Sequence, residues 1–147
     1  MNTPLINHTF WFVKSIYQEH LPYGFSTFQF DQSMDFKNAL IAAGLHHELS
    51  DTTLEHLALA ALLHNVGCIE GQYEKRSVSQ AIAQQYLAEK GCSPETAAQI
   101  LGFIEMTCPS SRPKTFLDRL IQQVKFHQAQ RFSGAQAMSD TVGDFWP

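Results

Sequence analysis

Cysteine is scarce and unpaired in this sequence. The 147-residue chain has three cysteines, Cys68, Cys92 and Cys108, which are widely spaced and form no Cys-x-x-Cys pair. An odd number without such a pair argues against a disulfide framework and against a structural zinc site of the usual spacing. We therefore expect a cytoplasmic protein, because disulfides are rare in that reducing compartment.

Long apolar runs and an excess of positive charge are also missing. The longest apolar run, 57–63, has seven residues, whereas a membrane-spanning helix needs about 20. No charged segment precedes "TFWFV" near the amino end, so we interpret this stretch as a helix face and not as a signal peptide. The net charge of −4 predicts no broad basic surface. We expect neither a membrane nor a nucleic acid as a partner.

Residue types that begin and end helices, by contrast, recur along the chain. The segment "TTLEHLALAALLH" is so rich in leucine and alanine that its second half is expected to be buried on most sides. No alternating pattern predicts a strand. The chain therefore predicts a single all-α domain of about six helices. These are expected at 3–20, from 31 or 33 to 44, and at 50–67, 78–90, 93–109 and 115–132, with loops at "LPYGFSTFQF" and "CIEGQYEKRS" and a polar tail over 133–147.

Five sequence pieces carry a resemblance to a known family. They occur in the order "QSMDFKNA", "LAALLHNVG", "EKRSVSQAIAQQYLAEKG", "PETAAQILGFIEMT" and "KTFLDRLIQQVKFHQA". From about residue 31 to 132 the chain resembles the HD superfamily, which consists mostly of metal-dependent phosphohydrolases. The resemblance implies an HD-like helical bundle.

The resemblance also implies where a metal site would lie. Members of the family hold a divalent cation with a histidine, an adjacent His-Asp pair and a later aspartate, and the metal activates a water molecule. At those positions this sequence has Gln32, His64, Asn65 and Lys125. Only His64 keeps a metal ligand. The chain is thus similar to an HD domain whose site has degenerated.

These replacements change the charge of the site. Two carboxylates are lost and one ammonium is gained. A like-charge pair at ~4 Å costs about 4 kcal/mol at an effective dielectric constant of 20. We therefore expect no bound metal, no cofactor and no catalytic residue. The leading hypothesis is a non-catalytic module that binds a small ligand or regulates another activity, with Gln32, His64, Asn65 and Lys125 around the ligand.

Two other functions stay open. The first is a phosphohydrolase that acts on a nucleotide or another phosphate ester through an atypical site. It would use Mn, Fe or Mg, held by His64 and recruited acids such as Asp31, Asp35 or Glu70. The second is an interaction protein that uses its helical surface and the aromatic pair at 145–146. No feature of the sequence predicts an oligomeric state.

Basic residues near the expected pocket suggest the charge of a ligand. Lys75, Arg76 and Arg112 are candidate phosphate-binding residues, and Lys114 and Arg119 lie in the same part of the sequence. The expected partner is a small anionic or phosphate-containing molecule. Solvated surface cations remain the alternative interpretation for all five.

The predicted site residues also have plain structural interpretations. His64 could be a core histidine bonded to the backbone, and Asn65 could cap a helix end. Lys125 could reach solvent or pair with an acid such as Glu70.

Other candidate residues are not expected to bind a metal or to take part in catalysis. His46, His47, Glu48 and His56 could resemble a second metal site, but the adjacent histidines after Gly44 are expected at the surface. Cys68 is not expected to be a nucleophile, although His64 lies four residues before it.

Overall fold

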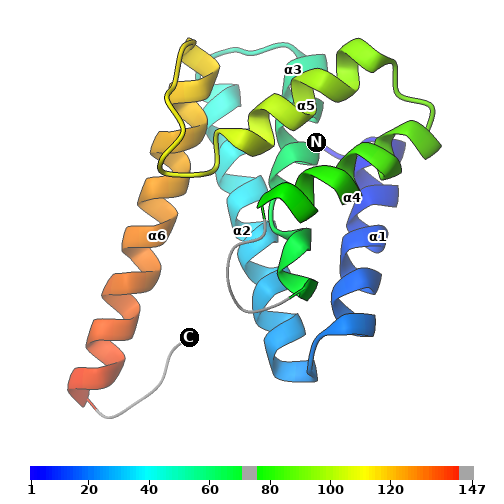
Figure 1. Ribbon diagram of the computed structural model, residues 1–147. Coiled ribbons are helices and arrows are strands. Elements are labelled where there is room, and N and C mark those ends of the chain that lie inside the picture. The colour runs from blue at the N-terminus through cyan, green and yellow to red at the C-terminus, as the bar shows by residue number, and fades with distance from the viewer. Residues whose placement is uncertain (71–75, 143–147) are drawn as a thin grey trace.

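The described part of the chain consists of helices alone. The computed structural model describes residues 1–70 and 76–142, with side chains to residue 130. Within these residues there are six α-helices, one 3-10 helix and no strand (Figure 1). They are Pro4–His20 (α1), Tyr23–His46 (α2), Asp51–Leu63 (α3), Val66–Glu70 (η1), Arg76–Glu89 (α4), Pro94–Glu105 (α5) and Phe116–Val142 (α6). The expected all-α class is confirmed.

Three helix starts follow from their capping residues. The hydroxyl of Thr3 accepts a hydrogen bond from the backbone N–H of Ile6, and Ser50 and Ser93 do the same for the residues three positions later. Each bond satisfies a backbone donor that the first turn of a helix leaves without a partner. The sequence predicted all three starts.

The expected start of the second helix was wrong. α2 begins at Tyr23 and not near residue 31, so most of the expected loop "LPYGFSTFQF" is helical. Pro22 stands just before the helix, where its missing N–H costs nothing, and Gly24 costs only about 1 kcal/mol in a helix. Packing against α1 offsets this cost. The rings of Phe10 and Phe30 meet edge to face with centroids 5.1 Å apart.

Other boundaries also differ from expectation: α3 ends at Leu63 and not at residue 67, and α5 ends at Glu105 and not at residue 109. α6 continues to Val142, through most of the segment expected to be a polar tail. That segment contains no proline before residue 147, and its alanines, glutamine and methionine favour helix despite their mixed polarity. The expected loop after Gly67 begins inside η1, which ends at Glu70.

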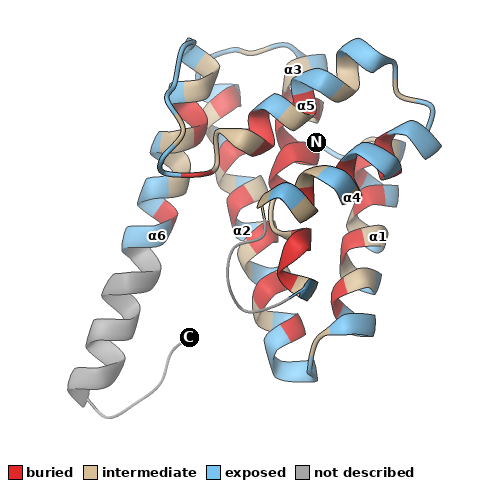
Figure 2. Ribbon diagram, in the orientation of Figure 1, coloured by how far each residue is buried: buried red, intermediate tan, exposed pale blue. Residues whose placement is uncertain are grey.

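Helix α3 lies at the centre of the bundle. Figure 2 colours residues by burial, and most of α3 is buried. Every residue from 56 to 63 is buried, which confirms the burial predicted for "LALAALL". Gly44 of α2 lets the two helices approach closely, because a Cβ atom there would lie 2.5 Å from Cδ2 of Leu54. This close packing lies at the first turn of α3, and the buried run that follows leads to His64 at the other end of the helix.

Helix α6 stands at one side of the bundle, next to α2 (Figure 1). It buries Leu120 and Ile121, and Leu117 and Val124 pack partly against the core. No described helix combines the length and apolar character that crossing a membrane requires.

Because α3 lies at the centre of the bundle, its buried side chains are expected to contribute strongly to the free energy of unfolding. Leu57 is fully buried, so Leu57→Ala should lower the free energy of unfolding by about 2–5 kcal/mol in urea denaturation. Leu45, which is 59% exposed at the end of α2, is the control. Leu45→Ala should change the free energy of unfolding by about 0.5 kcal/mol or less. Equal effects of the two substitutions would contradict the arrangement.

Candidate functional site

A pocket of about 610 Å³ lies between the end of α3, the segment after α5 and one side of α6. His64 and Asn65 line it at the end of α3. Residues 106–109 form one wall, and the facing wall is a stripe of α6 made of Arg119, Gln122, Gln123, Lys125, Phe126 and Ala129. Its volume lies within the ~300–1,000 Å³ typical of small-molecule sites.

The orientation of His64 is set by the backbone of its own helix. Nδ1 of His64 lies 2.7 Å from the carbonyl oxygen of Ala61. A carbonyl can only accept, so Nδ1 carries the proton and Nε2 of the neutral ring carries a lone pair. The orientation of the His64 ring therefore directs the lone pair of Nε2, a hydrogen-bond acceptor, toward α6.

Lys125 takes that lone pair. Its Nζ lies 3.0 Å from Nε2 of His64 and 3.3 Å from Oε1 of Gln128, and it stands 5.0 Å from the centre of the Phe36 ring. The ring of Phe36 meets that of His64 edge to face at 5.1 Å. The ammonium thus has two neutral acceptors and an aromatic face, each of which favours a cation.

Gln128 links this cation to the second helix. It is buried, and its Nε2 donates to the backbone carbonyl of Gln32 at 2.8 Å. His64, Lys125 and the main chain of Gln32 therefore belong to one hydrogen-bonded network. The side chain of Gln32 is half-buried and does not line the pocket.

Asn65 has a partner that the sequence analysis missed. Its Nδ2 donates to Oε1 of Gln29 at 2.7 Å, and Gln29 is 9% exposed. Gln29 lies almost one turn before Gln32 on α2. It escaped notice because this segment was expected to be a loop, whereas helical spacing extended back from Gln32 would have indicated it.

His64 is neutral in the folded protein. Burial, and then the nearby Lys125 ammonium, lower the pKa of His64 well below its usual value, against the opposing effect of the bond to Ala61. The ring can accept a hydrogen bond at Nε2 but does not donate one there. Donation from a protonated His64 ring to an anion is thus disfavoured at neutral pH.

The donor set does not fit the metal that the resemblance implies. His64 Nε2 already accepts from an ammonium, and Asn65 is paired with a neutral amide. Asp31, Asp35 and Glu70 are exposed, and none of them lines the pocket. No three or more histidine, cysteine, aspartate or glutamate side chains lie together as a metal site within the described residues.

The second histidine group is dispersed. His46, His47 and Glu48 are exposed at the end of α2, where the ring of His47 meets Phe116. His56 is buried on α3, apart from the exposed histidines, and its Nδ1 pairs with the side-chain oxygen of Gln99. A buried imidazole paired with an amide is a core contact.

Cys68 has the properties of a core residue. It is 5% exposed, and burial raises the pKa of its thiol to about 11. The thiolate needed for nucleophilic attack is therefore scarce at neutral pH.

The predicted phosphate-binding residues do not gather at the pocket. Arg76 forms an ion pair with Glu105 at 3.5 Å and borders a separate, more open depression. Arg112 is exposed and does not line the pocket, and Lys75 lies outside the described residues. Arg119, which the sequence marked only as a neighbouring cation, does line it. Its spacing from Gln122, Gln123 and Phe126 on one helix face could have identified it.

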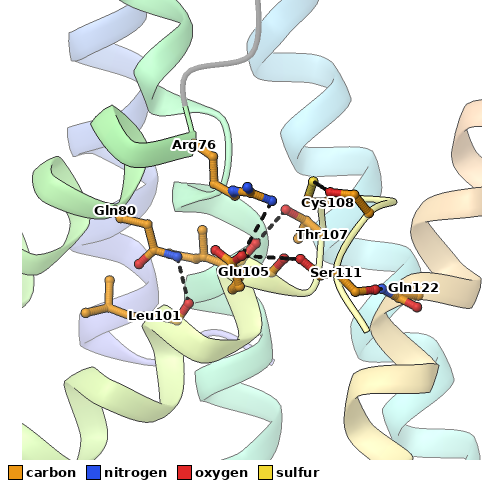
Figure 3. Close-up of polar contacts among 10 residues, drawn as sticks. Arg76, Gln80, Leu101, Glu105, Thr107, Cys108, Ser111 and Gln122 are labelled. Atoms are coloured by element: carbon orange, nitrogen blue, oxygen red, sulfur yellow. Dashed lines mark hydrogen bonds and ion pairs between the residues drawn. The ribbon is translucent and has the colours of Figure 1, made fainter. Parts of the chain in front are cut away.

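The wall formed by residues 106–109 is held by a polar network, shown in Figure 3. Ser111 Oγ donates to the backbone carbonyl of Glu105 at 2.8 Å, and Gln122 Nε2 donates to the carbonyl of Ser111 at 2.7 Å. The connection between α5 and α6 is thus bonded to both helices. Cys108 lies in this wall, and its Sγ is 3.1 Å from Oγ of Ser110.

Comparison with known proteins identifies no relative: no family model, curated protein or solved structure matches this chain.

The groups around His64 predict that the purified protein holds no metal. Protein purified without chelators should contain no stoichiometric Mn, Fe or Zn in elemental analysis, because His64 has neither a carboxylate partner nor an open lone pair. Stoichiometric metal that disappears in His64→Ala would contradict this assignment.

The lowered pKa of His64 predicts a pH dependence of stability. An unfolded histidine binds a proton near pH 6.5, and the folded one does so only at lower pH. Between these pH values the unfolded state holds more protons. The contribution of His64 to the free energy of unfolding should therefore fall below about pH 6.5, by up to about 1.4 kcal/mol per pH unit.

Denaturation at pH 7.5 and pH 5.5 tests this pH dependence. The loss of stability on acidification should be smaller in His64→Gln than in the wild type. His8→Gln, at an exposed position on α1, is the control and should behave as the wild type does. The same pH dependence in all three proteins would mean that His64 titrates normally.

Proposed function

We propose that this protein is a non-catalytic relative of the HD domains that binds a small anionic molecule in the pocket beside His64. A protein cation, Lys125, takes the position that the resemblance assigns to a metal ligand. The module serves to bind or sense its ligand and does not hydrolyse it.

The observation that carries the proposal is the charge of the pocket. Arg119 and Lys125 both line it, and no aspartate or glutamate does among the described residues. No described residue forms an ion pair or a hydrogen bond with the guanidinium of Arg119, which is exposed at the pocket. A guanidinium can bind the oxygens of a phosphate or carboxylate in a bidentate manner.

The contact between Lys125 and His64 supports the register of the family resemblance. In the family, the residues at these two positions bind one metal and must meet, although they are far apart in sequence. Here their nitrogens are 3.0 Å apart across 61 residues. The same contact supports a non-catalytic site, because the imidazole nitrogen that would hold a metal is occupied by an ammonium.

Anion binding can be measured with ¹⁵N-labelled protein titrated with inorganic phosphate and, separately, with acetate. The backbone signals of residues around Arg119 should shift. Arg119→Met should weaken binding roughly tenfold, or ~1.4 kcal/mol, because it removes the charged donor at the pocket. Lys114→Met removes the same charge at an exposed position outside the pocket and should bind as the wild type does.

Two results would overturn the proposal. Equal weakening by Arg119→Met and Lys114→Met would mean that only net charge matters and that the pocket is not the site. Metal-dependent hydrolysis of a phosphate ester that is lost in His64→Ala would show that the protein is an enzyme.

A further inference from the structure

We infer that the ligand is an organic anion with an apolar body of about the size of a ring, and not a small inorganic ion. Its charged group lies beside Arg119, and its apolar body lies between Phe126 and the wall formed by Met106 and Pro109. This inference rests on the proposed anion site and specifies the class of molecule that the site accepts.

The pocket is too large for a simple anion. Its volume of about 610 Å³ is in the range of sites that enclose most of an organic molecule. A phosphate or acetate ion bound at Arg119 would leave most of this space to water. The remainder of the pocket therefore indicates a larger ligand.

The α6 side chains that line the pocket differ in polarity along the helix. Arg119 and Gln123 stand at the amino-terminal end of this stripe, and Phe126 and Ala129 follow on the same side. The stripe from 119 to 129 spans about 15 Å at 1.5 Å per residue. The amino-terminal end thus offers charge and amide donors, and beyond Lys125 the stripe ends in the apolar side chains of Phe126 and Ala129.

The segment 106–109 adds further apolar side chains to the pocket. Met106 and Pro109 come from the connection that Ser111 and Gln122 hold in place. Met106 is partly buried against the core, and its thioether favours contact with an aromatic ring. A flat or compact apolar group between these walls would be in contact on both sides.

The exposed ring of Phe126 favours binding of a ligand with an apolar body. Phe126 is 60% exposed, although its ring borders a pocket. Burying the ring against an apolar body removes this surface from water, with a gain of about 25 cal/mol per Å². An inorganic anion cannot provide that contact.

Two matched pairs of probes test the inference on the full chain. Phenyl phosphate is compared with inorganic phosphate, and phenylacetate with acetate, by calorimetry and by ¹⁵N chemical shifts at pH 7.5. Within each pair the ring-bearing probe should bind at least tenfold more tightly. Phenol, which has the ring without the charge, should bind more weakly than either ring-bearing anion.

Matched variants locate the ring. Phe126→Ala should reduce the advantage of phenyl phosphate over phosphate at least fivefold while leaving phosphate binding as in the wild type. Phe116→Ala removes an exposed ring of α6 that does not line the pocket, and it should leave that advantage unchanged. Both variants should fold, because neither ring is part of the buried core, and circular dichroism checks this.

The outcomes separate this inference from the proposed function. If neither member of a pair binds, the proposed anion site itself is wrong. If both members bind equally, the anion site stands and the inference about the apolar body is wrong. Intermolecular NOEs from the phenyl ring to Met106 and Phe126 would support it, whereas NOEs only to exposed rings outside the pocket, such as Trp11 on α1, would overturn it.

Discussion

The hydrogen bond from the Lys125 ammonium to Nε2 of His64 is the contact on which the candidate site depends. It requires the backbone bond at Nδ1, since only a ring protonated there presents a lone pair toward α6. It joins the end of the central helix α3 to a helix at the side of the bundle. Together with the bond from Gln128 to the carbonyl of Gln32, it fixes one side of the pocket.

The same bond is the physical basis of the proposal that the site takes an anion and not a metal ion. A neutral histidine beside two carboxylates attracts a divalent cation, whereas the same histidine beside an ammonium does not. Where the resemblance implies carboxylates, this chain has Asn65 and Lys125, and its pocket has positive charge and no acid among the described lining residues. One change of charge thus accounts both for the expected lack of metal and for the proposed anionic ligand.

Much of the fold could be predicted from local sequence, and less of the site. Ser50 and Ser93 revealed helix starts because capping is a short-range interaction, and "LALAALL" revealed the buried centre. The start of α2 was missed because the packing of Phe30 against Phe10 outweighs the effect of Gly24, and no local signal shows this. That error concealed Gln29. His64 and Lys125 were paired only through the family resemblance, and Arg119 needed the three-dimensional arrangement to stand apart from the other cations.

The protonation of the His64 ring tests the central claim most directly. Long-range ¹H–¹⁵N correlation at neutral pH reports which ring nitrogen carries the proton. We predict a proton on Nδ1 and an unprotonated Nε2 whose ¹⁵N shift changes in Lys125→Met but not in Lys114→Met. A ring protonated at Nε2, or an Nε2 shift that Lys125→Met leaves unchanged, would contradict the account.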